Sequence, residues 1–457
     1  MNLKDRCIIL MKAIILAAGQ GKRMKSDLPK VLHNVSGKPM VNHVIDACKG
    51  AGVNDIVIVV GQGGEEVQES VTAYYKDCKD IKLTFVWQKE QLGTGHAVMC
   101  AKESISKEER IVILCGDTPL ITPELIKDVL KYQQDKSAHG VVVSTVVPDP
   151  KGYGRVITSP SGEFKAIVEE RDLEKNQKHI VSINTGMYVF MGLSLIHGLQ
   201  FIVNDNDQNE YYLTDVPKVM VEDDFKVAVY EDAEYSQFLG INSQKQLAEA
   251  ASIMRERIAD KHFNNGVIII DPASVYIDEG VQIEEGVVIH PGTVLTGTCK
   301  IGAGTVLNPY TVADGATIGK NCQIGPFAYL RNGTIIGDNC RIGNFVEVKN
   351  SKIGDGTKAA HHAYIGDAMV GNNVNYSCGA ITVNYDGKNK HLTEIEDGAF
   401  VGSNVNLVAP VKINSDAFVA AGSTITDEVP KGALAIARKR QEVKENWKNS
   451  KQTGATT

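Results

Sequence analysis

The chain has 457 residues, of which 43% are hydrophobic and 23% charged, a balance that excludes wholesale disorder. Its net charge of −7 argues against a broad nucleic-acid-binding surface, which would need a surplus of basic residues. No apolar run approaches the roughly 18 residues of a membrane span, and nine cysteines without a C-x-x-C pair indicate a reducing compartment instead of a disulfide framework.

The first half of the chain alternates β-branched runs with helical patterns. The stretch from Cys7 to Ala18 predicts a first strand, and a start at Met11 would leave residues 1–10 as an extension. A helix is expected at Val41–Cys48. Further strands are expected at Ile56–Val60, Ile111–Leu114 and Val141–Val147. This alternation predicts βαβ units and a mostly parallel sheet, whose ligands bind beyond the carboxyl ends of the strands.

An uninterrupted helical pattern divides the chain. Ser243 can cap a helix of about five turns over Ser243–His262, where neither Gly nor Pro occurs. We therefore expect an N-terminal domain over residues 1–241, a connecting helix over residues 242–263 and a C-terminal domain over residues 264–457. The polar end of the chain, from Lys439 onward, predicts a short helix and a tail.

Aliphatic residues recur every six positions in the C-terminal part, a spacing that fits neither an α-helix nor an ordinary strand. It is typical of a parallel β-helix, in which three hexapeptides make one triangular coil of about 18 residues. Chance spacing in a glycine-rich region is the alternative. The pattern places inward residues from Ile277 to Leu307, from Val312 to Val348 after a one-residue slip, and from Ile395 to Ile425. At Thr382–Glu394 we expect a polar loop to leave the coil.

A glycine-rich loop, Leu16 to Met24, follows the first strand. Small residues let backbone N–H groups approach a phosphate or a base. The Walker A and dinucleotide-binding patterns are both absent, and a plain strand–helix turn is the alternative. Arg23 and Lys30 can meet a polyphosphate, whereas a solvated surface position is the alternative for Lys30. Asp117 lies at a strand end, where a lone carboxylate commonly holds a hard cation.

The 18-residue coil also predicts columns of side chains on the β-helix. Arg331 and Lys349 would project from one face as a phosphate clamp, with scattered surface charge as the alternative. Tyr385, Ser403 and Ala421 would form another column if no residue is looped out between them.

The sequence resembles two known groups of enzymes. L-A-A-G-x-G-x-R-M, with P-K downstream, is similar to the nucleotidyltransferases that activate sugar 1-phosphates. The set Q-L-G-T-G-H-A, G-D-x-P-L, G-Y-G-R, I-V-E and N-T-G, with G-x-K-A-x-H in the second half, resembles the bifunctional N-acetylglucosamine-1-phosphate uridylyltransferase/glucosamine-1-phosphate acetyltransferase family. These motifs run from Leu16 to Arg438 and cover nearly the whole chain.

The resemblance implies an α/β fold with a Rossmann-like nucleotidyltransferase domain, a connecting helix and a left-handed parallel β-helix of hexapeptide repeats. It implies acetyl transfer from acetyl-CoA to glucosamine 1-phosphate, followed by uridylyl transfer from UTP with Mg²⁺. It also implies a cytoplasmic homotrimer with acetyl sites between subunits, and the sequence predicts no nucleic-acid or membrane partner. The alternatives are a monofunctional sugar-1-phosphate nucleotidyltransferase with a non-catalytic β-helix, and a non-enzymatic scaffold.

For the uridylyl half, the resemblance assigns Arg23 and Lys30 to the phosphates as catalytic residues, and Asp117 and Asn242 to Mg²⁺. Cys115 stands where the family often has Tyr. The residues implied for the nucleotide are Leu16, Ala17, Ala18, Gly19, Lys30, Gln88, Gly93 and Thr94. Those implied for the amino-sugar are Gly154, Glu169, Asn184 and Asn242.

For the acetyl half, the motif Gly356–His361 matches the family pattern that carries the catalytic base, so His361 and not His362 is expected to act. An imidazole suits this task because it accepts a proton near neutral pH. The residues implied for glucosamine phosphate are Arg331, Lys349, Tyr364 and Asn375. Those implied for acetyl-CoA are Cys378, Asn384, Tyr385, Ser403, Ala421 and Arg438.

Overall fold

The structure is a computed structural model that describes residues 10–206, 208–445 and 447. Cys7, most of the predicted extension and most of the predicted C-terminal tail lie outside these residues. The chain forms two compact units, residues 1–254 and residues 255–457. Within the described ranges, no helix has the length and apolar character that crossing a membrane requires.

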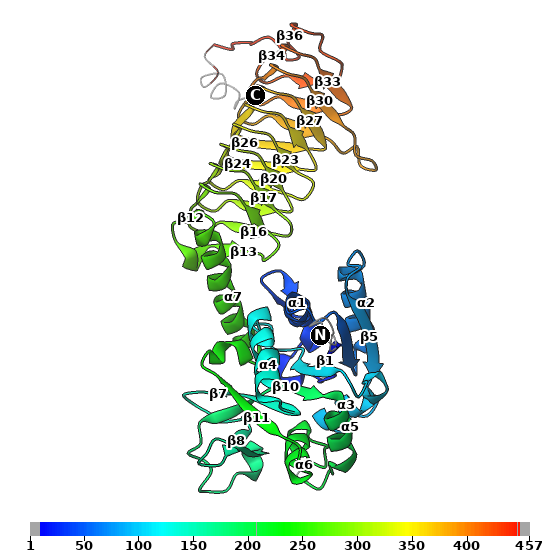
Figure 1. Ribbon diagram of the computed structural model, residues 1–457. Helices are drawn as coiled ribbons and strands as arrows, with labels where there is room; N and C mark the ends of the chain where they lie inside the picture. Colours follow the sequence, from blue (N-terminus) through cyan, green and yellow to red (C-terminus); the bar gives the residue numbers. More distant parts are fainter. Residues whose placement is uncertain (1–9, 207, 446, 448–457) are drawn as a thin grey trace, which may run out of the picture. The chain divides into compact units, whose positions relative to one another are not determined.

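The first unit is built on a mostly parallel sheet with the strand order β11-β7-β10-β6-β1-β4-β5 (Figure 1). Its strands are β1 (Met11–Ala17), β4 (Asp55–Val60), β5 (Lys82–Trp87), β6 (Arg110–Cys115), β7 (Gly140–Val146), β10 (Ser182–Met191) and β11 (Val227–Asp232). Only β10 runs antiparallel to its neighbours along this path, and β8 (Arg155–Thr158) and β9 (Phe164–Val168) extend from it as a hairpin. The predicted α/β class is confirmed.

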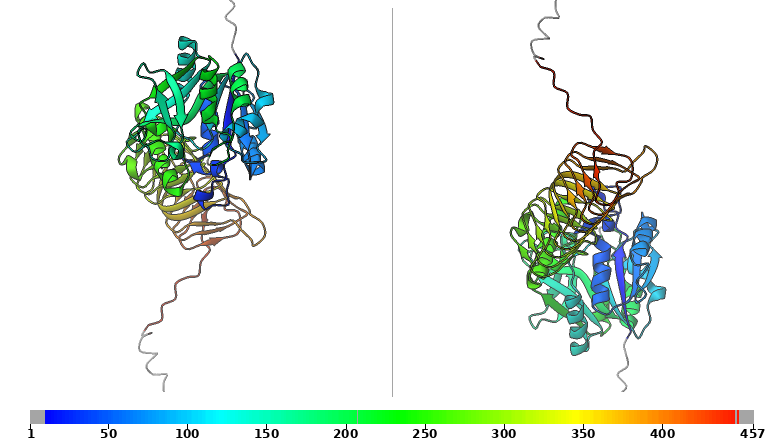
Figure 2. Two further views of the ribbon diagram at one scale, coloured as in Figure 1. Left: turned by 90° about the horizontal axis from the view of Figure 1, so that it is seen from below. Right: turned by 90° about the horizontal axis from the view of Figure 1, so that it is seen from above.

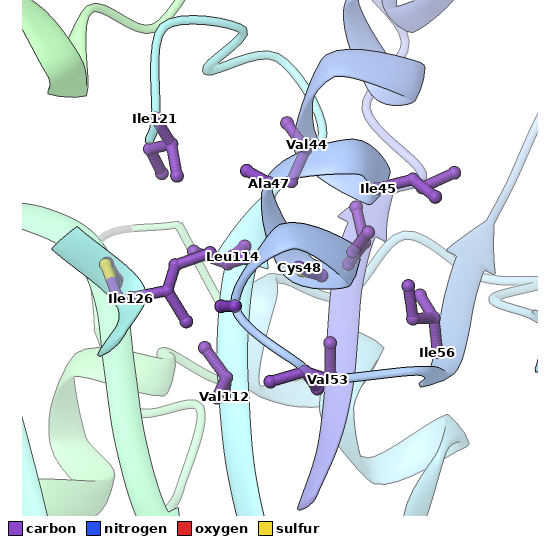
Figure 3. Close-up of a cluster of buried hydrophobic side chains, with 14 of the residues drawn as sticks. Val44, Ile45, Ala47, Cys48, Val53, Ile56, Val112, Leu114, Ile121 and Ile126 are labelled. Atoms are coloured by element: carbon purple, nitrogen blue, oxygen red, sulfur yellow. The ribbon is translucent and has the colours of Figure 1, made fainter. Parts of the chain in front are cut away.

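Both faces of this sheet are buried, which explains why its strands are nearly continuous aliphatic runs. One face packs against α1 (Met40–Gly50), α2 (Gly64–Tyr74) and α4 (Pro123–Lys136). The other packs against α3 (Thr94–Cys100), α5 (Gly192–Phe201) and α6 (Val216–Glu222). Figure 3 shows Val44 and Cys48 of α1 lying over Val112 and Leu114 of β6. This packing fixes the strand ends that carry the candidate site.

Helix α7 spans Gln244–Asn264, close to the predicted range. The Ser243 hydroxyl accepts a hydrogen bond from the Gln246 backbone N–H at 3.3 Å, so the predicted cap is present. The Gln246 side chain in turn accepts a hydrogen bond from the Asn242 backbone N–H at 2.9 Å. These two bonds resemble a capping box, except that the Gln246 side chain reaches the residue before the cap, and they satisfy two backbone donors at the start of the helix.

The second unit is a left-handed parallel β-helix, whose stacked coils are visible in Figure 1 and Figure 2. Long strands β24 (Arg341–Lys349) and β26 (Lys358–Gly366) cross from one face to the next. One face has β13 (Tyr276–Ile277), β16 (Val294–Thr296), β19 (Val312–Asp314), β22 (Tyr329–Leu330), β29 (Ile381–Val383), β32 (Asn406–Val408) and β35 (Thr424–Ile425). A second has β12 (Ile268–Ile269), β15 (Val288–Ile289), β18 (Val306–Leu307), β21 (Gln323–Ile324), β28 (Asn375–Tyr376), β31 (Phe400–Val401), β34 (Phe418–Val419) and β36 (Leu434–Ala435). The third has β14 (Gln282–Ile283), β17 (Lys300–Ile301), β20 (Thr317–Ile318), β23 (Ile335–Ile336), β25 (Lys352–Ile353), β27 (Ala368–Val370), β30 (Thr393–Ile395) and β33 (Val411–Ile413).

The predicted inward position of Val312 is wrong. Val312 pairs in register with Tyr329 on the outer surface, whereas Ala313 pairs with Leu330 and has no exposed surface. The five-residue step therefore falls between Ala313 and Ile318, and not before Val312. The interior residue there is a small alanine, so a pattern of large aliphatic side chains points to its larger neighbour, Val312.

The predicted column of Tyr385, Ser403 and Ala421 is also wrong at Tyr385. Tyr376 pairs with Val401, so consecutive coils differ there by 25 residues, and Ser403 lies above Cys378. The extra residues form the loop between β29 and β30, which confirms the predicted break in register. Tyr385 lies in that loop, where it bridges to Lys390.

Candidate active sites

A cavity of about 340 Å³ lies beyond the carboxyl ends of β1, β5 and β6 in the first unit. The residues predicted to hold the nucleotide all line it, together with Asp117. They are Leu16, Ala17, Ala18, Gly19, Lys30, Gln88, Gly93 and Thr94. This edge of a parallel sheet is where α/β folds bind ligands, because loops after neighbouring strands converge there.

Two glycines in the loops around this cavity are required by the backbone. Gly21 has φ +60°, and a Cβ atom there would lie 2.7 Å from the Cβ of Lys30. Gly93 has φ +102°, and a Cβ atom there would lie 2.6 Å from the Tyr211 carbonyl oxygen. A larger residue would displace Lys30 at the first position or the turn before α3 at the second. The two glycines therefore fix the shape of these loops and also let backbone N–H groups approach a ligand.

Lys30 joins the two residues predicted to bind a metal. Its ammonium forms an ion pair with Asp117 and donates a hydrogen bond to the Asn242 side-chain oxygen at 2.7 Å. All three side chains are at least partly buried. A carboxylate and an amide oxygen thus converge on one positive charge, although Lys30 and Asn242 are 212 residues apart.

Three of the residues predicted for the amino-sugar form a group of their own. The Gly154 carbonyl accepts a hydrogen bond from the Asn184 backbone N–H at 2.8 Å. A Cβ atom on Gly154 would lie 3.4 Å from the Glu169 carboxylate, so the two residues are in van der Waals range of each other. Burial raises the pKa of Glu169, while a hydrogen bond from the Thr214 hydroxyl at 3.2 Å opposes that shift.

Two further positions beside the cavity differ in exposure. Arg23 is exposed and is not among the residues that line the cavity. Cys115 does line it, and burial raises the pKa of its thiol to about 12, with the Asp117 carboxylate acting in the same direction. The thiol is therefore protonated at neutral pH and presents a small, weakly polar surface.

In the second unit, the predicted stacking of Arg331 and Lys349 is confirmed. Leu330 pairs in register with Val348, which places the next residues, Arg331 and Lys349, in one column. Arg331 also forms an ion pair with Glu347 at 2.9 Å. Tyr364 lies next in register above Glu347. The column carries a surplus of positive charge on an otherwise acidic protein.

His361 lies on β26 with an exposed ring. Its Nδ1 atom is 3.2 Å from the side-chain oxygen of Asn344, which occupies the matching position one coil below. A carboxamide oxygen can only accept, so Nδ1 carries the proton in the neutral ring. Nε2 is then left as a proton acceptor.

Five of the six residues predicted for acetyl-CoA belong to two groups. Cys378, Ser403 and Ala421 follow one column, since Tyr376 pairs with Val401 and Val401 pairs with Val419. Asn384 and Tyr385 belong to the loop: Asn384 donates to Asp367, and the Tyr385 hydroxyl donates to the Gly387 carbonyl at 2.8 Å. Arg438 is exposed beyond the last paired strand. Asn375 donates a hydrogen bond to the Ser377 hydroxyl at 2.9 Å.

Comparison with known proteins places both units in one family. Residues 13–175 match the MobA-like NTP transferase domain, residues 315–350 match bacterial transferase hexapeptide repeats, and residues 393–427 match the hexapeptide repeat of succinyl-transferase. The chain is 46% identical to the bifunctional protein GlmU of Clostridioides difficile, with 96% of this chain and 98% of the relative covered. It is 48% identical to that of Alkaliphilus oremlandii at the same coverage, and 47% identical to that of Caldanaerobacter subterraneus at 95% and 97%.

The chain belongs to the GlmU family.

Two residues of this GlmU-family chain that were not predicted contact residues predicted for acetyl transfer. Asn344 is found once the register is known, because it lies 17 residues before His361. Lys390 comes from the loop that leaves the coil. Its contact with Lys349, followed by the charge of Arg331, lowers the pKa of the Lys349 amine. Three cations therefore gather at one place, where a dianionic phosphate would relieve their repulsion.

A nucleotidyltransferase domain of the GlmU family implies a divalent metal. Among the described residues no group of three or more His, Cys, Asp and Glu side chains is placed to hold one. The oxygens of Asp117 and Asn242 nevertheless converge on a single cation, the Lys30 ammonium. Two protein oxygens fit a metal that takes its remaining ligands from water and substrate phosphates.

Proposed function

We propose that this chain makes UDP-N-acetylglucosamine with one activity in each unit. The β-helix acetylates glucosamine 1-phosphate with acetyl-CoA, and the first unit joins the product to UMP from UTP and releases pyrophosphate. Two observations carry the proposal. The cavity at the strand ends holds a glycine-rich loop, Lys30 and Asp117. The β-helix holds a histidine fixed by Asn344 and, on the same sheet, a column of stacked cations. The monofunctional alternative leaves His361 and that column without a purpose.

For uridylyl transfer, the chain's own residues position two anions. The glycine-rich loop, Gln88, Gly93 and Thr94 hold the nucleotide, while Lys30 and Arg23 meet its phosphates. Gly154, Glu169, Asn184 and Asn242 hold the sugar, whose phosphate oxygen attacks the α-phosphorus of UTP as pyrophosphate leaves. No covalent protein nucleophile takes part, since positioning and electrostatic stabilisation account for phosphoryl-type transfer.

Asp117 and Asn242 are the residues that would hold Mg²⁺. A bound Mg²⁺ supplies positive charge that neutralises the phosphates of both substrates. The Lys30 ammonium pairs with both residues. If Asp117 and Asn242 held a metal, Lys30 would be available to the nucleotide phosphates.

For acetyl transfer, His361 Nε2 accepts a proton from the amine of glucosamine 1-phosphate. The amine nitrogen attacks the thioester carbonyl carbon, the C–S bond breaks, and coenzyme A leaves as the thiolate, which takes up a proton. Asn344 positions the ring by holding Nδ1–H at 3.2 Å. Arg331, Lys349 and Lys390 bind the phosphate, with Tyr364 and Asn375 beside them. Cys378, Asn384, Tyr385, Ser403, Ala421 and Arg438 line the acetyl-CoA groove.

The proposal extends to the organisation of the protein. Residues 1–241 act as the uridylyltransferase domain, residues 242–263 as the connector and residues 264–457 as the acetyltransferase domain of a cytoplasmic homotrimer. An exposed aromatic ladder supports assembly through the β-helix. The Tyr310 and Phe327 rings stack at 5.2 Å and the Phe327 and Phe345 rings at 5.3 Å, with each ring about half exposed. Such an apolar edge is typical of a contact surface.

Product analysis tests the proposal. The purified chain is incubated with glucosamine 1-phosphate, acetyl-CoA, UTP and Mg²⁺, and the products are separated and weighed by mass spectrometry. We expect UDP-N-acetylglucosamine, free coenzyme A and pyrophosphate in equal amounts. Without acetyl-CoA no UDP-sugar should form, and N-acetylglucosamine 1-phosphate should restore it. A UDP-sugar that forms at the same rate without acetyl-CoA would contradict the acetyl half.

A further inference from the structure

The Gln88 side chain is held in one orientation at the wall of the nucleotide cavity. Gln88 follows β5, lines the cavity and is 5% exposed. Its amide nitrogen donates to the Gly93 carbonyl at 2.9 Å. A carbonyl oxygen can only accept, so the atom that faces it must be the amide nitrogen and not the amide oxygen.

The same amide nitrogen lies 3.2 Å from Nδ1 of His96 on α3. Because the nitrogen can only donate, His96 Nδ1 must accept, which makes the ring neutral with its proton on Nε2. That Nε2 faces the Cys100 sulfur at 3.9 Å, and the ring lies 6.5 Å from the Tyr211 ring between centroids. The histidine is therefore held from three sides, by Gln88, Cys100 and Tyr211.

An amide nitrogen carries two hydrogens, and here both point at protein acceptors. The group that Gln88 can offer a base is then its Oε1 oxygen, which only accepts. A pyrimidine with an N3–H, such as uracil, donates to that oxygen. Cytosine has an unprotonated N3, whose lone pair would be repelled by the lone pairs of the Gln88 Oε1 atom. Turning the amide over would set its oxygen against the Gly93 carbonyl. It would also set the oxygen against His96 Nδ1 as long as the ring keeps its proton on Nε2, which faces the Cys100 sulfur.

We infer that His96 is a positioning residue for base selection: it locks the Gln88 amide so that the cavity accepts a pyrimidine with an imide N–H and rejects cytosine. This inference rests on the proposed uridylyl activity and deepens it. His96 acts through Gln88 and need not touch the nucleotide. Its removal leaves one amide hydrogen without an acceptor and takes away one of the two contacts that oppose a flipped amide.

The test compares nucleotide discrimination in the full-length protein. Pyrophosphate release with N-acetylglucosamine 1-phosphate gives kcat/KM for UTP, CTP and dTTP. His96→Leu should lower the UTP:CTP ratio about tenfold, the scale of one unsatisfied hydrogen bond. The UTP:dTTP ratio should stay unchanged, because thymine carries the same N3–H. His96→Asn can place an oxygen near the former Nδ1 and should restore most of the UTP:CTP ratio, whereas His96→Gln places its amide near the former Nε2 and should not.

The acetyltransferase activity and Tm of each variant report on folding. If His96→Leu is unstable, the comparison of His96→Asn with His96→Gln still tests the inference, because both variants keep a polar side chain. An unchanged UTP:CTP ratio in His96→Leu would overturn the inference, as would equal losses for UTP and CTP, which indicate a merely structural role. Equal ratios in His96→Asn and His96→Gln would overturn it as well. A wild-type protein that does not turn over UTP at all would instead overturn the proposed function.

Discussion

The two units bring residues together by different rules. In the first, Lys30 reaches Asn242 across 212 residues of sequence, because loops after separate strands meet at one edge of the sheet. In the second, His361 reaches Asn344 across 17 residues, because each coil repeats the one below. Neighbours in a β-helix thus follow from counting, whereas neighbours at a sheet edge depend on the strand order.

The largest effect is expected from Asp117→Ala. Uridylyl transfer should fall roughly a thousandfold, because the change removes a proposed metal ligand and the partner of Lys30, and metal stabilisation of a transition state is worth several kcal/mol. Acetyl transfer should stay within twofold of wild type. Asp135→Ala is the control, since Asp135 is an exposed residue of α4 paired only loosely with Lys131 at 3.8 Å. Loss of acetyl transfer in a folded Asp117→Ala protein would contradict separate sites.

The next effect concerns the adjacent histidines of β26. His361→Ala should lower kcat of acetyl transfer by about 10²–10⁴, the range for removal of a general base, and should leave uridylyl transfer intact. His362→Ala changes the neighbouring residue and should lower kcat by less than about tenfold. The kcat of acetyl transfer in both variants is measured from the release of coenzyme A, which a thiol reagent detects. Equal losses in the two variants would show that the register around Asn344 and His361 does not select the base.

Core packing in the β-helix separates inward from outward positions. Leu330→Ala should destabilise the second unit by about 2–5 kcal/mol, because Leu330 has no exposed surface. Val312→Ala changes a residue on the outer surface and should cost about 1 kcal/mol or less. Denaturant unfolding followed by circular dichroism measures the difference. Equal costs would contradict the register in which Ala313, and not Val312, points inward.

The smallest effect is a dependence of stability on pH. The Lys412 ammonium at 2.7 Å from Glu396, with hydrogen bonds from Ser415, lowers the pKa of Glu396 to about 2 from an ordinary value of 4.5. A lowered pKa adds stability that is present above pH 4.5 and is lost as the pH falls toward 2. Glu396→Gln should therefore have a lower Tm than wild type at pH 7, and the gap should close on acidification. A gap that widens at low pH would contradict this.

Sequence alone predicted both fold classes, because strand–helix alternation and the six-residue period each reflect how side chains reach a core. The residues that it predicted for the nucleotide do line one cavity, since they lie in local motifs, but Val31, Ala97 and Glu210 line that cavity as well. It placed Val312 inward in error, because the interior residue there is the smaller Ala313. It misplaced Tyr385, because the length of a looped-out segment does not show in an 18-residue count. Asn344 requires the exact register, because the coil there advances by 17 residues and not by 18. Lys390 and the role of His96 depend on contacts between segments, which no local motif contains.

Complementation of two variants tests the central claim of two independent chemical sites most directly. Asp117→Ala and His361→Ala proteins are assayed singly and in equal mixture with glucosamine 1-phosphate, acetyl-CoA, UTP and Mg²⁺. Each alone should form almost no UDP-N-acetylglucosamine, and the mixture should form it readily, because one variant releases N-acetylglucosamine 1-phosphate for the other to use. A mixture as inactive as its components, although each retains its one partial activity, would contradict the account.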